Sequence, residues 1–297
     1  LHKEYRRQRQ MCIRDRPSTV PMIMASGPAS HISMRFGLHG PTHTYSIACA
    51  SSTVAIGEAF RAIRDGYLDT ALSGGAEAML NDGSIAAWER LGVLASSHTD
   101  GPEASSRPFD LERTGFVLGE GAALLVLEAE SALQERAVDP IAEIIGYGVS
   151  RDAFSLTEPH AAGQEAAMRS AITDADIERE EVQYVNAHAT GTPSGDPIEI
   201  EAIKSIFEDH ASNLAVSSTK SVHGHLVGAS GALETAISAI ALQKGRIPPT
   251  ANLTDPDPSC DLDCVPEYGR EAPELTVAIS NSFAFGGSNA TLVLRKV

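Results

Sequence analysis

Cys49 is the residue of this chain whose surroundings best suit a nucleophile. It lies in the string SIACASSTVAIGEAFRAIRDG, where a short apolar run of β type gives way to an amphipathic helix at the cysteine. The free N–H groups and the positive end of the dipole at a helix N-terminus favour the thiolate, which is the reactive form of cysteine. The plainer interpretation is a small apolar cysteine packed at the end of a strand, because free cysteines are among the most buried residues.

Two histidines and a lysine occupy comparable positions in the second half of the chain. His188 lies in VNAHATGTPSGDPIE, directly after a predicted strand and before a predicted helix. Lys220 and His225 lie five residues apart in STKSVHGHLVGASG, and the glycines Gly286 and Gly287 of NSFAFGGSNA allow backbone to approach a ligand closely. Because α/β proteins assemble their chemistry in loops at the ends of strands, we expect these segments to meet at one site.

Each of these residues also has a structural explanation when it is taken alone. A single histidine at a strand end is usually a structural residue, and Thr190 and Thr192 suit a turn or a helix cap. Asp196 fits an N-terminal helix charge and Glu199 a first-turn charge. The combination of a helix-N-terminal cysteine, two histidines and a lysine favours the catalytic interpretation.

An internal repeat indicates how these segments are positioned. Cys49 is followed by ASSTVAIGEAFRAIRDG, and Gly228 is followed by ASGALETAISAIALQKG. Both strings are 17 residues long, begin with Ala-Ser and carry apolar residues at helical spacing before a glycine stop. The chain therefore contains two related βα halves, joined near residues 137–140.

The alternation of strand-like and helical segments predicts an α/β layered fold. In the second half we expect strands at 141–149, 182–188, 214–219, 276–287 and 289–295, and helices at 163–175, 196–208 and 229–245. In the first half we expect strands at 45–49, 70–78 and 121–128, and a helix at 50–66. By symmetry with the second half, two further strands and two further helices should precede VPMIMASG, so we expect the first half to be truncated at its start.

Composition and charge exclude several functional classes. The chain has 297 residues, 42% of them hydrophobic and 21% charged, which is typical of a globular protein. A net charge of −16 argues against a nucleic-acid partner, and no apolar run is long enough to cross a membrane. Four cysteines without a secretory signal favour a reducing cytoplasm over a disulfide framework.

The predicted organisation has three parts. The first is a basic arm at residues 1–16, with six Lys/Arg against two Asp/Glu and no apolar periodicity, which we expect to be disordered or non-native. The second is an incomplete N-terminal half at 17–137, and the third is a C-terminal half at 138–297.

Five ordered motifs resemble those of the β-ketoacyl-acyl-carrier-protein synthases, and most closely the type II condensing enzymes of bacterial fatty acid synthesis. They are ACASSTVAIGEA, SRPFDLERTGFVLGEGAALLVLE, NAHATGTPSGD, STKSVHGHLVGASGALE and NSFAFGGSNA. The resemblance runs from about Pro17 to the C-terminus. It implies a thiolase-like fold with two duplicated halves in a layered α-β-α-β-α arrangement, of which the first half is incomplete here.

The resemblance also implies an acyltransferase, a 3-oxoacyl-acyl-carrier-protein synthase. Such an enzyme condenses a cysteine-bound acyl group with malonyl-acyl-carrier protein and releases CO₂. Its expected partners are acyl carrier protein and a second copy of the chain, and no cofactor is expected. Enolate charge develops on a thioester oxygen as CO₂ leaves, and two fixed N–H donors stabilise that charge without a cofactor.

Residue roles follow from the same resemblance. Cys49 would accept the acyl group, and the backbone N–H groups of Cys49 and Phe285 would form the oxyanion hole, with Phe285 also gating the acyl pocket. His188 and His225 would stabilise the enolate, and Lys220 would hold the site electrostatically.

Other positions would support this machinery. Asp196 and Glu199 would be the carboxylate partners of the lysine, and Thr190 and Thr192 would contact the pantetheine arm. Some relatives hold a monovalent cation near the site, and the positions that match its ligands are Asn186, Glu234, Ser280 and Asn289.

Three residues depart from the family pattern. Ala189 and Ala284 stand where glycine is common, which is tolerable if both backbones keep φ below zero. His223 places an additional imidazole two residues before His225.

The sequence also bears on several alternatives to the type II enzymes. A thiolase needs a second catalytic cysteine in the last glycine-rich loop, which reads AFGG here, and type III condensing enzymes have asparagine in place of His225. A non-catalytic chain-length partner usually lacks the nucleophile, whereas Cys49 is present. An inactive truncated fragment and a ketosynthase of a polyketide pathway both remain open.

Overall fold

The computed structural model describes residues 19–136 and 138–297, which belong to two compact units, residues 1–46 and residues 47–297. In the first unit the described residues form two helices, α2 (Thr19–Ile23) and α3 (Gly27–Phe36). Helix α3 ends at Gly37, whose φ of 65° is the left-handed conformation that suits glycine after a helix. The basic arm predicted at 1–16 lies outside the described residues.

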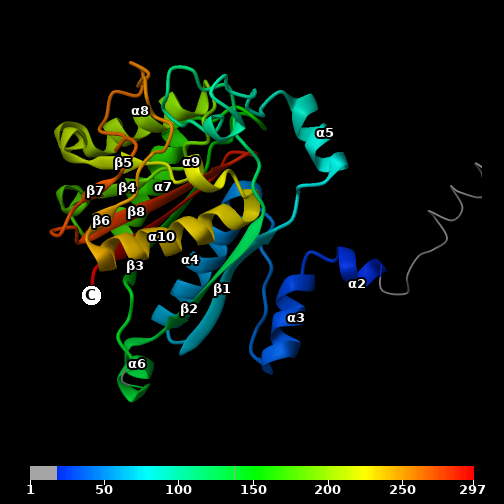
Figure 1. Cartoon of the computed structure of the whole chain (residues 1–297). Coiled ribbons are helices and arrows are strands. Elements are labelled where there is room, and N and C mark those ends of the chain that lie inside the picture. The colour runs from blue at the N-terminus through cyan, green and yellow to red at the C-terminus, as the bar shows by residue number, and fades with distance from the viewer. Residues whose placement is uncertain (1–18, 137) are drawn as a thin grey trace, which may run out of the picture. The chain divides into compact units, whose positions relative to one another are not determined.

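A five-stranded sheet forms the centre of the second unit (Figure 1), and its strand order is β3-β9-β8-β4-β5. Its strands are β3 (Glu143–Arg151), β4 (Tyr184–Asn186), β5 (Ala215–Ser217), β8 (Val277–Ala284) and β9 (Ser288–Arg295). Strand β4 runs parallel to both β5 and β8, whereas β9 is antiparallel to β3 and β8. The C-terminal ends of three neighbouring parallel strands therefore share one edge.

Helices cover both faces of this sheet. Alternate residues of β8 point to opposite faces, and Asn281 contacts Met168 of α7 (Ala161–Asp174). The next residue, Ser282, hydrogen-bonds Thr53 of α4 (Ser51–Arg64) at 2.7 Å. Helix α8 (Gly195–Phe207) packs beside α7, and α10 (Ser230–Lys244) packs beside α4.

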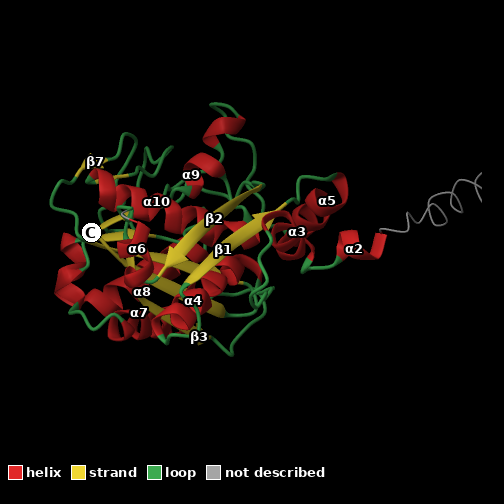
Figure 2. Ribbon diagram, turned by 90° about the horizontal axis from the view of Figure 1, so that it is seen from below, coloured by secondary structure: helices red, strands yellow, loops and turns green. Residues whose placement is uncertain are grey.

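A second sheet has two antiparallel strands, β1 (Thr70–Glu77) and β2 (Gly121–Glu128). Helices α4 and α10 contact both sheets and therefore form the layer between them (Figure 2). The face of β1–β2 that points away from these helices exposes Leu72, Leu124 and Val126. The described residues thus form the helix, sheet, helix and sheet layers of the expected thiolase-like fold, with the first half incomplete.

Shorter elements connect these layers. The remaining helices and short strands are α5 (Asp82–Leu91), α6 (Glu130–Arg136), α9 (Lys220–His223), β6 (Arg246–Ile247) and β7 (Arg270–Glu271). The 3-10 turns are η1 (Ala48–Ala50), η2 (Pro102–Ala104), η3 (Arg179–Glu181), η4 (Glu208–Asn213) and η5 (Val227–Ala229). Within the described residues, no helix combines the length and apolar character that crossing a membrane requires.

The duplication seen in the sequence is repeated in backbone detail. Turn η1 leads directly into α4 and turn η5 leads directly into α10. Ala48 and Val227 occupy equivalent positions and both have positive φ, 44° and 45°. This conformation is uncommon for residues with a side chain, so its occurrence at both positions identifies one turn used twice.

The strand predicted at 45–49 does not form. Residues 41–47 have no regular secondary structure, and Cys49 belongs to η1. A strand needs a hydrogen-bonded neighbour, and no strand of the described residues pairs with this segment. The other predicted strands and helices form within a few residues of their expected limits.

Candidate active site

Cys49 lies at the start of the layer of helices between the two sheets, where η1 precedes α4. Its side chain is buried, with 6% of the residue exposed, and its Sγ lies 3.0 Å from Nε2 of His225. The backbone N–H groups of Phe285 and of Cys49 itself also contact the thiol. One sulfur atom is therefore surrounded by an imidazole and by the two N–H groups expected for an oxyanion hole.

The two histidines approach the cysteine from different elements. His188 follows β4, and His225 follows α9. Their ring centroids are 5.4 Å apart, and the ligand-type atoms of both rings and of Cys49 lie within 4.8 Å of one another. The structure thus brings together three residues that are widely separated in the sequence.

The charge states of these groups are controlled by burial. Burial raises the pKa of the Cys49 thiol to about 11, although Lys220 and the N–H of Phe285 act in the opposite direction. Burial, together with the positive charge of Lys220, holds the pKa of His188 and His225 well below the usual histidine value. Near pH 7 the site therefore contains a neutral thiol and two neutral imidazoles. The net effect on Cys49 is opposite to the one that the helix N-terminus alone predicts.

Ser230 controls the orientation of His225 through its hydroxyl. Its Oγ lies 3.0 Å from Nδ1 of the histidine and accepts the backbone N–H of Leu226 at 2.9 Å. A hydroxyl can donate to Nδ1 or accept from it, so both tautomers of the imidazole are possible. Nε2 of His225 can consequently accept the thiol proton in one step and act as a donor in another.

Lys220 has a different carboxylate partner from the one expected. Its Nζ forms a buried ion pair with Glu234 of α10 rather than with Asp196 or Glu199. Helix α10 follows the same loop as Lys220, so the pair links α9 to the repeated helix. The sequence had placed Glu234 only among the possible cation ligands, because residue spacing does not show that α10 packs against Lys220.

Glu199 instead fixes the backbone that carries His188. Its carboxylate accepts the N–H groups of His188 at 2.9 Å and Ala189 at 2.7 Å, together with the amide of Asn281 at 3.2 Å. Burial raises the pKa of Glu199 to about 7 against these hydrogen bonds.

Asp196 has a similar part in the next turn. It accepts the N–H groups of Gly191 at 3.1 Å and Phe109 at 2.9 Å, and Nε of Arg113 lies 3.8 Å away. Burial raises the pKa of Asp196 to about 6 despite these contacts. Both carboxylates therefore support the segment after β4.

These groups open onto a cavity of about 200 Å³. Cys49, both histidines, Phe285, Thr190 and Thr192 line it. The ring of Phe285 packs against Trp88 of α5, with 6.1 Å between ring centroids, and Trp88 also contacts Phe116 at 5.5 Å. Phe285, the predicted gate, thus contacts both the nucleophile through its backbone N–H and an aromatic cluster that the sequence did not reveal.

Comparisons with known proteins identify the family of this chain. The sequence models of the β-ketoacyl synthase N-terminal and C-terminal domains match residues 2–132 and 141–254. The chain belongs to the β-ketoacyl synthase family. It is 45% identical over 278 residues to Nodulation protein E of Rhizobium sp. (strain N33), and 42% identical over 282 residues to 3-oxoacyl-[acyl-carrier-protein] synthase 2 of Staphylococcus aureus (strain COL). Each match covers 94% of this chain and 67% of the relative.

Solved ketosynthase structures have the same fold. A type II polyketide ketosynthase, in complex with its acyl-carrier protein and bound to the hexaketide, superimposes with a TM-score of 0.89 at 33% identity. That match covers 92% of this chain and 67% of the other. A β-ketoacyl synthase from Burkholderia phymatum STM815 gives a TM-score of 0.86 at 38% identity, covering 91% of this chain and 65% of the other. The chain thus spans about two-thirds of the length of these relatives.

The four residues that matched cation ligands do not form one site in this ketosynthase. Asn186 donates to the backbone oxygen of Glu234 and lies opposite Ser280 in the sheet. Asn289, however, lies on β9 three residues before Leu292, the residue that pairs with Ser280. Three residues of a strand span about 10 Å. Its amide binds Ser150 and Asp152 instead. Within the described residues, Asn186 and Ser280 do carry buried side-chain oxygens without a hydrogen-bond partner, whereas the carboxylate of Glu234 pairs with Lys220.

The departures from the family pattern have local explanations. Ala189 and Ala284 are absent from the residues with positive φ, which agrees with the expectation that alanine is tolerated there. His223 turns away from the thiol, with Nδ1 2.7 Å from the oxygen of Gly224 and Nε2 3.0 Å from Thr219. The additional imidazole therefore stabilises the α9 turn.

Sequence reasoning missed Ser230 and Trp88, and it named Glu234 only as a possible cation ligand. Ser230 could have been found, because it occupies the same repeat position as Ser51. Both hydroxyls accept a backbone N–H from four residues earlier, from Ile47 at 2.8 Å and from Leu226 at 2.9 Å. Trp88 gave no such signal, since its role depends on the packing of α5 against Phe285, which follows β8.

Proposed function

We propose that this chain catalyses the decarboxylative condensation of a Cys49-bound acyl group with a malonyl thioester carried by acyl carrier protein. The observation that supports it best is the convergence of the Cys49 thiol, two neutral imidazoles and two backbone N–H groups on one cavity. This set contains a nucleophile, a proton acceptor and donors for oxyanions, which are the groups that the reaction needs.

The first half-reaction is acyl transfer. The Cys49 thiol proton passes to Nε2 of His225, 3.0 Å away, as sulfur attacks the thioester carbonyl of the donor. The N–H groups of Cys49 and Phe285 stabilise the tetrahedral oxyanion. The carrier thiolate leaves, takes up the proton and departs as a thiol. Because the free thiol has a raised pKa, we expect proton removal to accompany attack rather than to precede it.

The second half-reaction is condensation. The malonyl carboxylate loses CO₂, and its electron pair forms an enolate whose oxygen accepts N–H donors from His188 and His225. The enolate carbon attacks the acyl carbonyl on Cys49, the new carbon–carbon bond forms, and the C–S bond breaks. The Cys49 thiolate then takes up one proton from solvent, and a 3-oxoacyl thioester leaves. Each preorganised donor of this kind contributes about 3–4 kcal/mol to lowering the barrier.

Fatty acid synthesis is the pathway we propose, on the strength of the synthase 2 relative from Staphylococcus aureus. A polyketide-type pathway is the second candidate, because a structural neighbour is a type II polyketide ketosynthase bound to a hexaketide. The two differ in the acyl group that Cys49 accepts and in whether the 3-oxo product is used again as a donor.

Acyl carrier protein is the proposed partner, supported by the neighbouring ketosynthase that was solved with its own acyl-carrier protein. A homodimer and a cytoplasmic location belong to the same proposal. If a monovalent cation binds near the site, Asn186, Glu234 and Ser280 would hold it, and we assign it no chemical step.

Mass spectrometry of the intact chain after incubation with acyl-acyl-carrier protein tests the proposal. We expect one acyl group on Cys49, and after addition of malonyl-acyl-carrier protein we expect its loss together with a 3-oxoacyl product. A chain that gains no acyl group would support the alternative of an inactive fragment. A single extension of a saturated acyl group that stops at the 3-oxoacyl product would favour the fatty acid pathway. Repeated extension, with the 3-oxoacyl product used again as a donor, would favour the polyketide-type pathway.

A further inference from the structure

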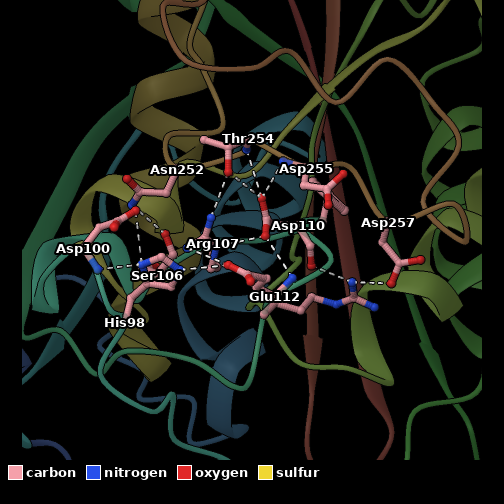
Figure 3. Close-up of polar contacts among 12 residues, drawn as sticks. His98, Asp100, Ser106, Arg107, Asp110, Glu112, Asn252, Thr254, Asp255 and Asp257 are labelled. Atoms are coloured by element: carbon pink, nitrogen blue, oxygen red, sulfur yellow. Dashed lines mark hydrogen bonds and ion pairs between the residues drawn. The ribbon is translucent and has the colours of Figure 1, made fainter.

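The motif SRPFDLER has no role in the reaction described above, yet three of its four charged side chains, those of Arg107, Asp110 and Arg113, are buried. Asp110 is fully buried and accepts hydrogen bonds from Nε of Arg107 and from the backbone N–H groups of Glu112, Thr254 and Asp255, each at 2.9 Å (Figure 3). Burial alone would raise the pKa of Asp110, but these donors lower it below the ordinary value. The motif is thus fastened to the segment at 252–257.

Arg113, the last residue of the motif, links this hydrogen-bonded region to the loop that carries Thr192 and Pro193. Its side chain is 3% exposed, and Nη1 binds the backbone oxygen of Asp110 at 2.9 Å and Oδ2 of Asp257 at 2.6 Å. Nε donates to the oxygen of Thr192 at 3.0 Å, and Nη2 donates to the oxygen of Pro193 at 3.1 Å. All three nitrogens of the guanidinium are therefore engaged, and two of them hold consecutive carbonyl groups.

The held carbonyls belong to the turn that presents Thr190 and Thr192 to the cavity. Oγ1 of Thr192 accepts the N–H of Gly195 at 3.1 Å, and its own proton stays available for a ligand. A planar fork that binds two adjacent carbonyls fixes the orientation of the peptide planes between them. Lysine carries the same charge but lacks the planar group that donates to both carbonyl oxygens.

We propose that Arg113 is a positioning residue that sets the affinity of the site for the pantetheine arm of its substrate. The inference deepens the proposed function and rests on it for the identity of the arm. Arg113 does not contact the reacting atoms. It acts through the Thr190–Thr192 turn, which it joins to Asp110 and Asp257.

The test measures pantetheine binding separately from chemistry, through protection of Cys49 from iodoacetamide. In Arg113→Lys we expect the half-protecting concentration of pantetheine to rise about tenfold, as for the loss of one charge-assisted hydrogen bond. The alkylation rate without pantetheine should stay within about twofold of wild type. Arg169→Lys is the matched control, because Arg169 is an exposed residue of α7 that pairs with Glu165, and it should change neither quantity.

Two further measurements keep the outcome interpretable. Asp257→Asn leaves the guanidinium in place and removes one of its charged partners. It should therefore raise the half-protecting concentration of pantetheine by a smaller factor than Arg113→Lys.

In acyl-transfer assays, Arg113→Lys should raise KM for acyl-pantetheine about tenfold with kcat nearly unchanged. It should leave transfer from acyl-N-acetylcysteamine, which lacks most of the arm, unaffected. An unchanged half-protecting concentration of pantetheine, or an equal loss of acyl transfer from both thioesters, would overturn the positioning role. Protection by pantetheine in a chain that transfers no acyl group would contradict the proposed function alone.

Discussion

The state of the Cys49 thiol is set by two opposing features of its surroundings. The positive charge of Lys220 and the backbone N–H groups of Phe285 and of Cys49 itself favour the thiolate. Burial opposes them and prevails, so the resting thiol is protonated. The nearby imidazole of His225 then matters more than the helix N-terminus, because it can accept the proton during attack.

Replacement of the nucleophile should separate the two half-reactions. In Cys49→Ala, we expect condensation to be lost, while malonyl decarboxylation continues because both imidazole donors remain. Release of CO₂ and of 3-oxoacyl product, measured in parallel from malonyl-acyl-carrier protein, distinguishes the steps. A variant that still elongates acyl groups would refute the assignment of Cys49.

The ion pair of Lys220 should be visible in the reactivity of Cys49. In the double variant Lys220→Met, Glu234→Gln, the pair is replaced by neutral groups, and the pKa of the thiol should rise further because its main neighbouring cation is gone. The iodoacetamide rate at pH 8.5 should then fall, by about tenfold for each unit of pKa. In wild type the rate should keep climbing above pH 9, since the thiol has a pKa of about 11.

Lys204→Met is the control for this experiment. Lys204 pairs with Asp261 at the surface, so its loss should leave the alkylation rate unchanged. A double variant that reacts as fast as wild type would show that Lys220 does not influence the thiol.

At the scale of elements, the site is built from one turn used twice. The first copy holds Cys49, and the second holds Gly228, whose N–H binds Glu77 of β1 at 3.1 Å. The helices that follow pack closely, and a Cβ at Gly231 would overlap Thr53 and Ser282. This close approach of α4 and α10 brings Cys49 to the loop that carries His225.

The hydrogen bonds and the ion pair of the buried Asp110 carboxylate should contribute strongly to stability. Asp110→Asn leaves the buried Arg107 without its carboxylate, so we expect the free energy of unfolding to fall by about 3–5 kcal/mol. Glu165→Gln breaks the surface pair with Arg169 and should cost about 0–1 kcal/mol. Denaturant unfolding of both variants provides the comparison.

The same variants give a pH dependence with a definite sign. The folded pKa of Asp110 is lowered from 3.8, so its stabilisation is present above that value and is lost as pH falls through the folded pKa. The difference between wild type and Asp110→Asn should therefore shrink below about pH 4. A difference that stays constant down to pH 2 would indicate that the charge of Asp110 is not involved.

At the scale of the whole second unit, helices cover the outer face of one sheet but not the outer face of the other. Helices α7 and α8 cover the outer face of the five-stranded sheet, whereas the outer face of β1–β2 exposes Leu124 and Val126 at 50% and 63%. Contiguous exposed apolar residues on a sheet favour association with other surfaces.

Charged residues on this face should reduce self-association without loss of stability. We expect the double variant Leu124→Glu, Val126→Glu to show weaker concentration dependence in sedimentation velocity, because neither side chain belongs to the interior. Its thermal midpoint should stay close to that of wild type. The exchange Leu292→Glu at a fully buried position of β9 is the contrasting case and should prevent folding.

Much of the fold and the site followed from the sequence alone, because their signals are local. Strand and helix periodicity, the glycine stops and the repeated Ala-Ser turn depend on neighbouring residues, and they placed Cys49, His188 and His225 at the ends of elements. The strand expected at 45–49 failed because pairing is not a local property.

The tertiary structure alone decided what these residues do to one another. The partner of Lys220 is Glu234, the partner of Asp196 is Arg113, and Asn289 lies too far along its hairpin to join the other expected cation ligands. The same holds for the thiol of Cys49, whose helix-start position predicts a lowered pKa while burial raises it. Partnership and desolvation depend on which segments the fold packs together across the sheet, and neither is encoded in the spacing of residues along the chain.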